Sequence, residues 1–202
     1  DVLATDLPAG DPRAKGWSRT AQHASRAEQL YRPSCPRRLF DRHVQVRPVD
    51  MKALPDDLTG FDFVWSSCAL EHLGSLEAGT AFVKRSLGCL RPGGIAVHTT
   101  EFNLTSNEAT TSEGPTVAYR MRDIEALLDE LRARGHQARP FLIGERHGVL
   151  DRIIDIPPYT YSALLVRLGP HVLTSAILVI RVASPEMLSG GSYDRSKTAY
   201  KN

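Results

Sequence analysis

The chain has 202 residues, of which 42% are hydrophobic and 24% charged, and its formal net charge is +2. This length and composition predict one globular domain with a sizeable core. A net charge so close to zero gives no basis for a nucleic-acid or membrane surface. Three widely spaced cysteines fit neither a disulfide framework nor a zinc site, so a reducing cytoplasm is the expected location.

The first predicted strand is Val2–Asp6, a very short apolar run that ends on a carboxylate. A strand that ends in Asp suits a ribose site, because one carboxylate can accept hydrogen bonds from both sugar hydroxyls. An Asp that caps the following turn is the alternative. The segment Asp11–Arg42 is expected to be an irregular loop with two helical turns over Ser25–Tyr31, long enough for a lid over a substrate.

The second predicted strand, Val44–Asp50, alternates apolar and polar residues and also ends on a carboxylate. Asp50 either contacts a ligand or caps the turn into Met51–Leu54. The nearby arginines are expected to form a solvated face, with recognition of an acidic substrate group as the minor alternative. These arginines are Arg37, Arg38, Arg42 and Arg47.

The stretch Gly60–Asn103 predicts a strand, a helix, a glycine turn and a second strand. The run Phe61–Trp65 is apolar and aromatic, as in a strand covered on both faces. Apolar residues recur at helical spacing over Leu70–Leu90, and Pro92–Gly94 ends that helix before the strand Ile95–Thr100. Such a unit is a right-handed crossover, with ligands at the carboxyl ends of its parallel strands. That edge carries Ser66, Ser67, Glu71, His72, Thr99, Glu101 and Asn103.

The remainder of the chain predicts further α and β elements. They are a polar loop at Leu104–Pro115, an amphipathic helix at Arg122–Arg134, a strand at Ala138–Ile143, a loop with two prolines at Asp151–Tyr161 and a last strand at Ser175–Val182. Gly135 follows the helix at the position where a left-handed residue closes it. Residues 184–202 are polar and rich in glycine and serine, which predicts a disordered tail.

Two motifs in the central block, FDFVWSSCALEHL at residues 61–73 and LRPGGIAVHTTEFN at residues 90–103, resemble the fourth and fifth strands of class I methyltransferases that use S-adenosylmethionine. The resemblance extends over roughly residues 2–182. It implies an α/β fold with a Rossmann-like, mostly parallel sheet, helices on both faces and an antiparallel last strand. The methyltransferase-like domain would occupy residues 1–183, and S-adenosyl-L-methionine would be its cofactor.

The resemblance also implies which residues hold the cofactor. Asp6 matches the carboxylate that binds the ribose. Asp50 matches the acidic residue that accepts from the adenine amino group, and Met51 matches the neighbour that packs on the ring. The predicted cofactor-binding set is Asp6, Leu7, Asp50, Met51, Ser66 and Ser67.

Methyl transfer mainly requires that the protein position the acceptor, exclude water and, where needed, remove a proton. The predicted catalytic residues are His72 and Glu71, because a neutral imidazole suits proton removal near pH 7. The resemblance also implies that the histidine of the LEH phrase lies toward the cofactor. The alternatives are that His72 supports or caps the site and that Glu71 stabilises the helix start. His98 is a weaker candidate base that is expected to be a packed strand residue. Glu101 and Asn103 are the predicted acceptor contacts.

One expected part is missing, because no G-x-G-x-x-G occurs in the sequence. In the family this loop follows a first strand that lies upstream of Asp6. Without that strand, a slot with costly unpaired backbone groups would separate the strands that end at Asp6 and Trp65. The chain is then a fragment, or the two strands pair directly, or another segment fills the slot. A fragment with a partial cofactor site is the expectation.

The leading functional hypothesis is an enzyme that methylates an oxygen or nitrogen of a small molecule or glycan, with no nucleic-acid or membrane partner. A degenerate methyltransferase-like module without catalysis is the alternative, supported by the missing glycine loop. A nicotinamide oxidoreductase would also use Asp6, but the predicted carboxy-terminal strands argue against it. Nucleic-acid methylation would need a basic stripe with stacking aromatics. The histidines show no ligand spacing, so no metal site is predicted.

Overall fold

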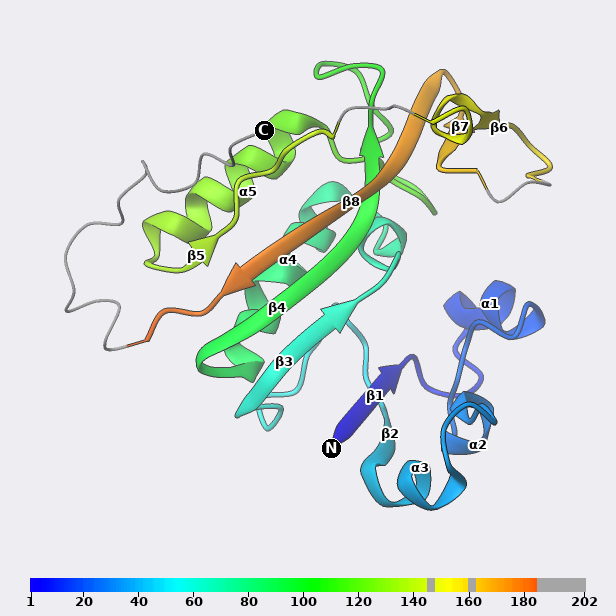
Figure 1. Cartoon of the computed structure of the whole chain (residues 1–202), viewed down its shortest axis with the longest axis vertical. Coiled ribbons are helices and arrows are strands. Elements are labelled where there is room, and N and C mark those ends of the chain that lie inside the picture. The colour runs from blue at the N-terminus through cyan, green and yellow to red at the C-terminus, as the bar shows by residue number, and fades with distance from the viewer. Residues whose placement is uncertain (145–147, 160–162, 185–202) are drawn as a thin grey trace. The chain divides into compact units, whose positions relative to one another are not determined.

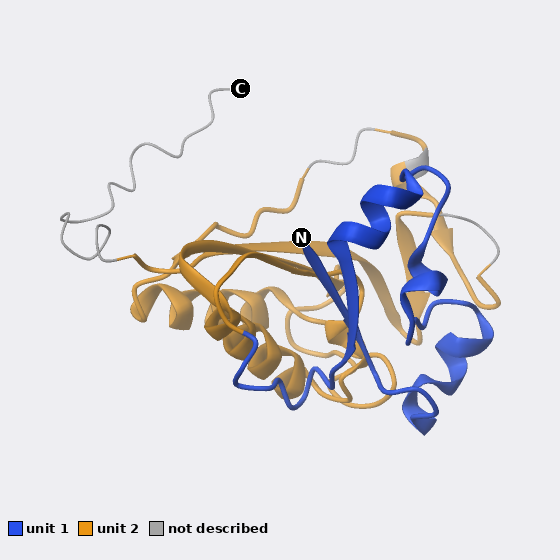
Figure 2. Cartoon of the chain, turned by 90° about the horizontal axis from the view of Figure 1, so that it is seen from below, with its two compact units in different colours: residues 1–58 blue, residues 59–202 orange. Residues whose placement is uncertain are grey.

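The computed structural model describes residues 1–144, 148–159 and 163–184. The chain divides into two compact units, residues 1–58 and 59–202, which Figure 2 shows in different colours. The strands form a two-stranded sheet and a six-stranded sheet (Figure 1). Of the predicted tail, only Ser184 lies within the described residues.

The first unit is built on two parallel strands, β1 (Val2–Asp6) and β2 (Val44–Pro48), which confirm both strand predictions. Their register runs from Val2 beside Val44 to Asp6 beside Pro48. The Val49 N–H then donates to the Asp6 carbonyl at 2.8 Å. Because parallel strands end at the same edge, Asp6, which ends β1, and Asp50, which follows β2, lie at neighbouring strand ends.

Short helices occupy much of the segment that was predicted to be irregular. They are η1 (Pro12–Ala14), α1 (Lys15–Arg19), α2 (Ala27–Leu30) and α3 (Arg37–His43). Of these, α2 confirms one of the two helical turns predicted over Ser25–Tyr31. The prediction was wrong at η1, α1 and α3, which are helical. In α3, Phe40 is buried and its ring packs edge-on against Tyr31. This tertiary contact selects a helix that local propensity alone leaves undecided.

The second unit begins with the predicted crossover. Strand β3 (Phe61–Ser66) pairs in parallel with β4 (Leu90–Asn103), and the connection contains η2 (Leu70–His72), α4 (Leu76–Ser86) and η3 (Leu87–Cys89). The connection is therefore three helical pieces instead of one. Gly74 has a φ of +96°, and Ser75 caps α4 by accepting from the Ala78 N–H, so the α-helix starts only there.

The carboxy-terminal elements complete the six-stranded sheet. They are α5 (Met121–Ala133), β5 (Gln137–Ala138), η4 (Leu150–Arg152), β6 (Ile154–Asp155), β7 (Leu165–Leu168) and β8 (His171–Arg181). The order along the sheet is β3-β4-β8-β7-β6, with β5 beside β8. Strand β8 runs antiparallel to β4, and β6 runs parallel to β7. The α/β class and the antiparallel last strand are thus confirmed.

Two predictions in this region were wrong. The predicted strand over Ala138–Ile143 ends at its first residue. Arg139 still donates its N–H to the Val179 carbonyl, but Pro140 then offers no backbone donor and the chain leaves the sheet. The predicted loop over Asp151–Tyr161 contains η4 and β6. Its last two residues lie outside the described part.

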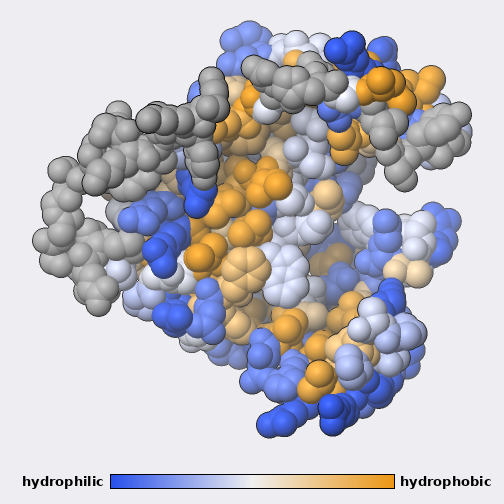
Figure 3. All heavy atoms as spheres, in the orientation of Figure 1, coloured by the Kyte–Doolittle hydropathy of each residue, from blue (hydrophilic) through white to orange (hydrophobic). Residues whose placement is uncertain are grey.

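The two faces of the central strands differ in what covers them. Ala96, His98 and Thr100 of β4 are buried on one face, where both α4 and α5 pack. On the opposite face, Trp65 of β3 is 56% exposed and Ile177 of β8 is 60% exposed. Figure 3 shows apolar side chains gathered over β3, β4 and β8 on this face. The predicted second helical layer stays a prediction.

No helix in the part of the chain that the structure describes is both long enough and apolar enough to cross a lipid bilayer.

Candidate functional site

In the first unit, the carboxylate of Asp6 is held in place at the end of β1. The Leu7 N–H donates to its Oδ1 at 2.8 Å, and the Ala24 N–H donates to its Oδ2 at 3.0 Å. The buried His23 lies with Nε2 3.8 Å from Oδ1 and donates to the Leu7 carbonyl at 2.8 Å. A carboxylate offers about four acceptor positions, so about two remain. The predicted ribose carboxylate is therefore oriented and keeps acceptor capacity.

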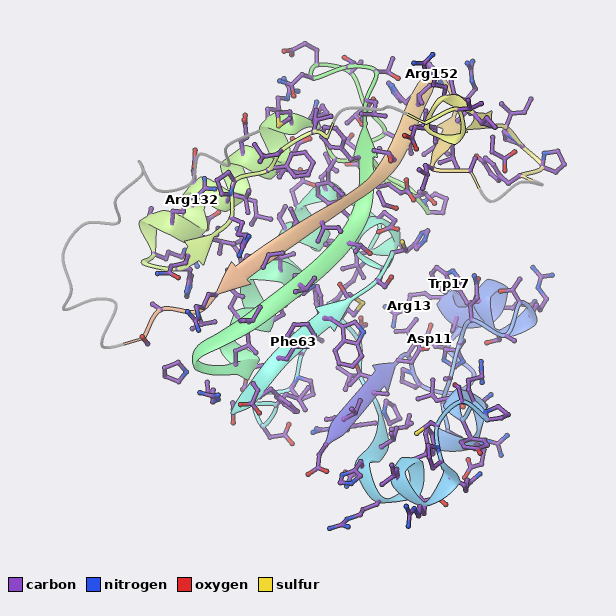
Figure 4. All side chains as sticks on the ribbon, viewed as in Figure 1. Asp11, Arg13, Trp17, Phe63, Arg132 and Arg152 are labelled. Carbon is purple, nitrogen blue, oxygen red and sulfur yellow. The ribbon has the colours of Figure 1, made fainter. Side chains whose placement is uncertain are left out.

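The second predicted cofactor carboxylate, Asp50, is bound by an arginine. Arg13 donates from Nη1 to Oδ2 of Asp50 at 2.8 Å, and the Lys52 N–H donates to Oδ1 at 2.9 Å. Arg13 also binds Asp11 through Nε and Nη2, and Figure 4 labels both side chains. Burial raises the pKa of the Asp50 carboxyl, but these hydrogen bonds outweigh it and leave the pKa below its ordinary value. Met51 follows and is partly exposed.

Arg13 is a site residue that the sequence did not predict. A single arginine in a loop carries no local signal, and its partner Asp50 lies 37 positions further along the chain. Its planar guanidinium donates in a fixed geometry and therefore restricts the orientation of the Asp50 carboxylate. Any group that binds Asp50 must either share this carboxylate with Arg13 or displace the guanidinium.

In the second unit, the two serines at the end of β3 lie in different environments. The Ser66 hydroxyl is 2.8 Å from His98 Nδ1, and His98 Nε2 is 3.2 Å from the Ser86 hydroxyl. Ser86 donates to the Val83 carbonyl, so it accepts from Nε2–H, and Nδ1 accepts the Ser66 proton. Burial lowers the pKa of His98 to about 4, so the ring is neutral at pH 7. This geometry favours the packed-histidine interpretation of His98.

Ser67, in contrast, is exposed just beyond the strand. The Thr99 hydroxyl donates to Ser67 Oγ at 3.4 Å and accepts from the Cys68 N–H at 2.9 Å. Cys68 itself adopts a left-handed φ of +47°. Of the two serines predicted to bind the cofactor, Ser67 alone presents its hydroxyl outside the helix-covered face.

The predicted catalytic pair lies at the connection between β3 and α4. Glu71 is 1% exposed and accepts from the Thr100 hydroxyl at 3.1 Å. Burial raises the pKa of its carboxyl. His72 lies with Nδ1 2.8 Å from the Pro115 carbonyl, which can only accept, so Nδ1 carries a proton. In the neutral ring, Nε2 is then the proton-accepting nitrogen.

Glu101 lies on β4 near this pair. Burial raises the pKa of the Glu101 carboxyl, and the charge of Glu71 raises it further, while His72 opposes the shift. The Tyr119 N–H donates to the Glu101 carbonyl at 2.9 Å. The structure therefore brings Glu71, His72 and Glu101 into one electrostatically linked cluster at the carboxyl ends of β3 and β4. A cluster of this kind can accept a proton and stabilise the resulting imidazolium.

Asn103, the other predicted acceptor contact, is buried at the end of β4 and holds the loop that follows. Its Oδ1 accepts from the Thr105 and Ser106 N–H groups. Its Nδ2 donates to the Ala109 carbonyl and lies 3.2 Å from the Thr110 hydroxyl. A contact between Asn103 and substrate stays a prediction, and it would compete with these bonds.

The sequence missed two further parts of the site. Thr100 lies two residues after His98 on β4 and therefore on the same face of the strand. The alternation of apolar and polar residues already predicts that this face is buried. The Pro115 carbonyl carries no side-chain signal at all. Within residues 1–144, 148–159 and 163–184, no group of three or more His, Cys, Asp or Glu side chains could hold a metal ion.

No family model and no curated protein matches the chain. Among solved structures, the [4+2]-cyclase SpnF shares 20% identity over 90% of this chain and 75% of its own, with a TM-score of 0.49. A SAM-dependent methyltransferase from Methanosarcina mazei shares 11% identity over 91% and 93%, with a TM-score of 0.45. The 1,6-didemethyltoxoflavin-N1-methyltransferase of Burkholderia thailandensis, solved with S-adenosylhomocysteine, shares 15% over 90% and 71%, with a TM-score of 0.44. At these values the likeness assigns no activity to this chain.

Proposed function

We propose that this chain is an S-adenosylmethionine-dependent methyltransferase that acts on an oxygen or nitrogen of a small molecule. The observation that carries the proposal is the cluster of Glu71, His72 and Glu101 at the carboxyl ends of two parallel strands. In a parallel α/β sheet this edge is where ligands bind. The motifs that resemble methyltransferases contribute all three of these residues.

The carboxylates of the first unit fit the nucleoside part of the cofactor. Asp6 keeps about two acceptor positions after its bonds to Leu7 and Ala24, which matches the two hydroxyls of a ribose. Asp50 is ionised and oriented, and Met51 beside it offers an apolar surface for a base. When bound, the cofactor supplies a methyl group that is bonded to a sulfonium sulfur. The neutral thioether that departs is a good leaving group.

The chain's own chemical contribution is to hold and move a proton. The Pro115 carbonyl fixes the Nδ1–H form of His72, and Nε2 accepts the proton of the acceptor group. The carboxylates of Glu71 and Glu101 then stabilise the positive ring. Thr100 holds the Glu71 carboxyl in position.

Calorimetric titration of the chain with S-adenosylhomocysteine tests the cofactor assignment. We expect saturable binding that weakens by about tenfold or more in Asp6→Asn and in Asp50→Asn, because each removes a charged acceptor. Asp56→Asn is the matched control, since this exposed carboxylate lies in the same unit. A chain that is folded by circular dichroism and gives no heat of binding would overturn the proposal.

Substitution of His72 separates catalysis from binding. We expect His72→Gln to lower turnover by about 100-fold or more, the usual contribution of a positioned base, while S-adenosylhomocysteine still binds. Thr116→Ala is the control, because it removes only the neighbouring hydroxyl 3.4 Å from Nδ1. Unchanged turnover in His72→Gln would remove the general-base role.

The second candidate function is a module that binds without catalysis, and the absent G-x-G-x-x-G is the observation that favours it. This alternative expects binding of S-adenosylhomocysteine, or of a partner, with no methyl transfer to any acceptor. Turnover by the unmodified chain would exclude it.

A further inference from the structure

A cavity of about 440 Å³ lies along the outer edge of β8, in the second unit. Among the described residues, the neighbours of β8 cover only the ends of that edge. Strand β7 pairs with residues 171–173 and β5 with residues 180–181. Between them, the segment 140–144 has left the sheet and lines the far side of the cavity.

The backbone of β8 adds hydrogen-bonding groups to this cavity. The bond from the Arg139 N–H to the Val179 carbonyl shows that the odd-numbered residues of β8 direct their backbone N–H and C=O groups toward the outer edge. Ser175 and Ile177 therefore direct their N–H and C=O groups at the cavity. Neither forms a backbone pair on this side with any residue that the structure describes.

The cavity is mainly apolar, with a cation at one end. Its lining includes Phe102, Leu128, Phe141, Ile143, Leu165 and Ile177. Arg139 is the charged residue of this lining, and it is exposed and forms no ion pair with any side chain in the described part of the chain. A volume of this size and a lining of this kind are typical of sites for small organic molecules.

At the opposite end of the cavity, the β4–β8 register places Glu101 of the proton-accepting cluster beside a lining residue. Ser175 lies directly across the β4–β8 ladder from Glu101, so their Cβ atoms are roughly 5 Å apart. Ile177 lies across from Thr99, which binds Cys68 and Ser67. Ser175, which lines the cavity, is therefore a direct cross-strand neighbour of Glu101 in the cluster.

The register also sets the length of a ligand that would contact both ends. Arg139 lies beside Val179 and Glu101 lies opposite Ser175, which is four residues along β8. Four residues of an antiparallel strand span about 13 Å. A single ring is shorter than this distance, whereas two or three fused rings with substituents match it.

We propose that this cavity binds the methyl acceptor, and that the acceptor is a fused-ring aromatic hydroxy acid. Its carboxylate would pair with Arg139, its rings would lie against Phe141 and Ile177, and its hydroxyl would reach Glu101 and His72. The proposal rests on the proposed function and selects an apolar small molecule over a glycan, whose many hydroxyls this lining would leave unpaired.

Fluorescence titration of the full chain with 6-hydroxy-2-naphthoate tests the cavity without any cofactor. The matched pair of variants is Ile143→Ser, which alters the lining, and Ile156→Ser, which lies outside it; both isoleucines are 56% exposed. We expect Ile143→Ser to weaken binding about tenfold, from the lost apolar contact, and Ile156→Ser to leave it unchanged. Equal effects of the two variants, or no binding by the folded chain, would overturn the proposal.

The variant Arg139→Gln tests whether Arg139 binds the carboxylate of the ligand and not its rings. We expect it to weaken binding of 6-hydroxy-2-naphthoate by about tenfold and to leave binding of 2-naphthol, which lacks the carboxylate, unchanged. Equal losses for both probes would contradict the placement of the carboxylate. Competition by methyl β-glucoside would contradict the choice of an apolar acceptor.

The two proposals fail separately. If the naphthoate binds with the expected variant pattern while S-adenosylhomocysteine does not bind, the cavity stands and the methyltransferase function falls. If S-adenosylhomocysteine binds and the naphthoate does not, the function stands and the acceptor class is wrong. Methylation of the naphthol hydroxyl by the chain and S-adenosylmethionine would support both.

Discussion

His98 and Thr100 occupy neighbouring positions on the helix-covered face of β4, and each organises a different polar cluster. His98 connects Ser66 to Ser86 inside the core, with both ring nitrogens bonded. Thr100 holds the carboxyl of Glu71 beneath the proposed proton-accepting site. His98 thus contributes to the stability of the core, whereas Thr100, two positions further along the strand, contributes to the proposed site.

The buried His98 makes the stability of the protein depend on pH. Its pKa is about 4 in the folded protein and 6.5 in an unfolded chain, so the folded state binds fewer protons between these values. The stability due to neutral His98 is therefore complete above pH 6.5 and is lost as pH falls toward 4. We expect a loss of about 3 kcal/mol over that range.

Urea unfolding at several pH values measures this loss. His98→Gln, which does not titrate and can still bond to both serines, is expected to lack this part of the pH dependence. Parallel curves for the two proteins between pH 7 and pH 4 would show that His98 is not the group responsible.

The site was partly predictable at this scale because strand ends carry a clear sequence signal. Asp6 ends β1 as the pattern predicted, Asp50 follows two positions after the end of β2, and the roles of Asp6, Asp50 and His72 stay predictions. Which way a side chain points depends on strand phase: β3 directs Ser66 to the helix-covered face and leaves Ser67 outside it. Partners distant in sequence, such as Arg13 for Asp50, leave no local pattern.

At the scale of elements, helix α4 is fitted closely to the segment that follows β4. Tyr119 is buried, and its hydroxyl donates to the Leu76 carbonyl at 3.3 Å. The same hydroxyl lies against Gly79, so closely that a Cβ atom on this glycine would overlap it. The segment is also joined to the start of α4 by backbone bonds from Leu76 to Ser112 and from Gly114 to Gly74.

This contact predicts a reversal of the usual effect of a helical glycine. Replacing Gly by Ala inside a helix ordinarily stabilises it by about 1 kcal/mol. Gly79→Ala is expected instead to destabilise the protein by about 1–3 kcal/mol, because the buried Tyr119 must move. Thermal unfolding should show recovery in Gly79→Ala/Tyr119→Phe relative to Gly79→Ala alone. A more stable Gly79→Ala protein would contradict the close packing of Tyr119 against Gly79.

Elements with a strong periodic pattern were predictable from sequence, and short or interrupted ones were not. The apolar stripe of α5 and the runs of β1 and β3 placed those elements within one residue of their bounds. The strand predicted over Ala138–Ile143 was too long. The apolar run Phe141–Ile143 has the pattern of a strand, and the sequence does not indicate that it lines a cavity instead. Strand β7 has four residues and depends on pairing with β8, a contact outside any local window.

At the scale of the whole molecule, one face of the six-stranded sheet carries large apolar side chains that the described residues leave accessible. Phe63 and Trp65 stack on β3 with ring centroids 5.8 Å apart, and Figure 4 labels Phe63. Phe63 is 45% exposed. Apolar surface of this extent commonly leads to association between protein molecules.

We expect the chain to associate as its concentration rises in sedimentation velocity experiments. Trp65→Lys should reduce this association and change the free energy of unfolding by no more than about 0.5 kcal/mol, since the side chain is exposed. Val149→Lys, at an 80% exposed position away from β3, is the control. A chain that stays monomeric at all concentrations would contradict the expectation.

The pairing of β4 with β8 has a consequence for how the protein is made. Strand β4 reaches its final partner only when residues 171–181 have been synthesised, long after the β3–α4–β4 crossover has left the ribosome. During that interval one long edge of β4 has no neighbour, and such an edge is prone to pair with other chains. A ribosome that stalls before residue 171 would therefore release a product that aggregates, and a chaperone would have to protect it until the last strand arrives.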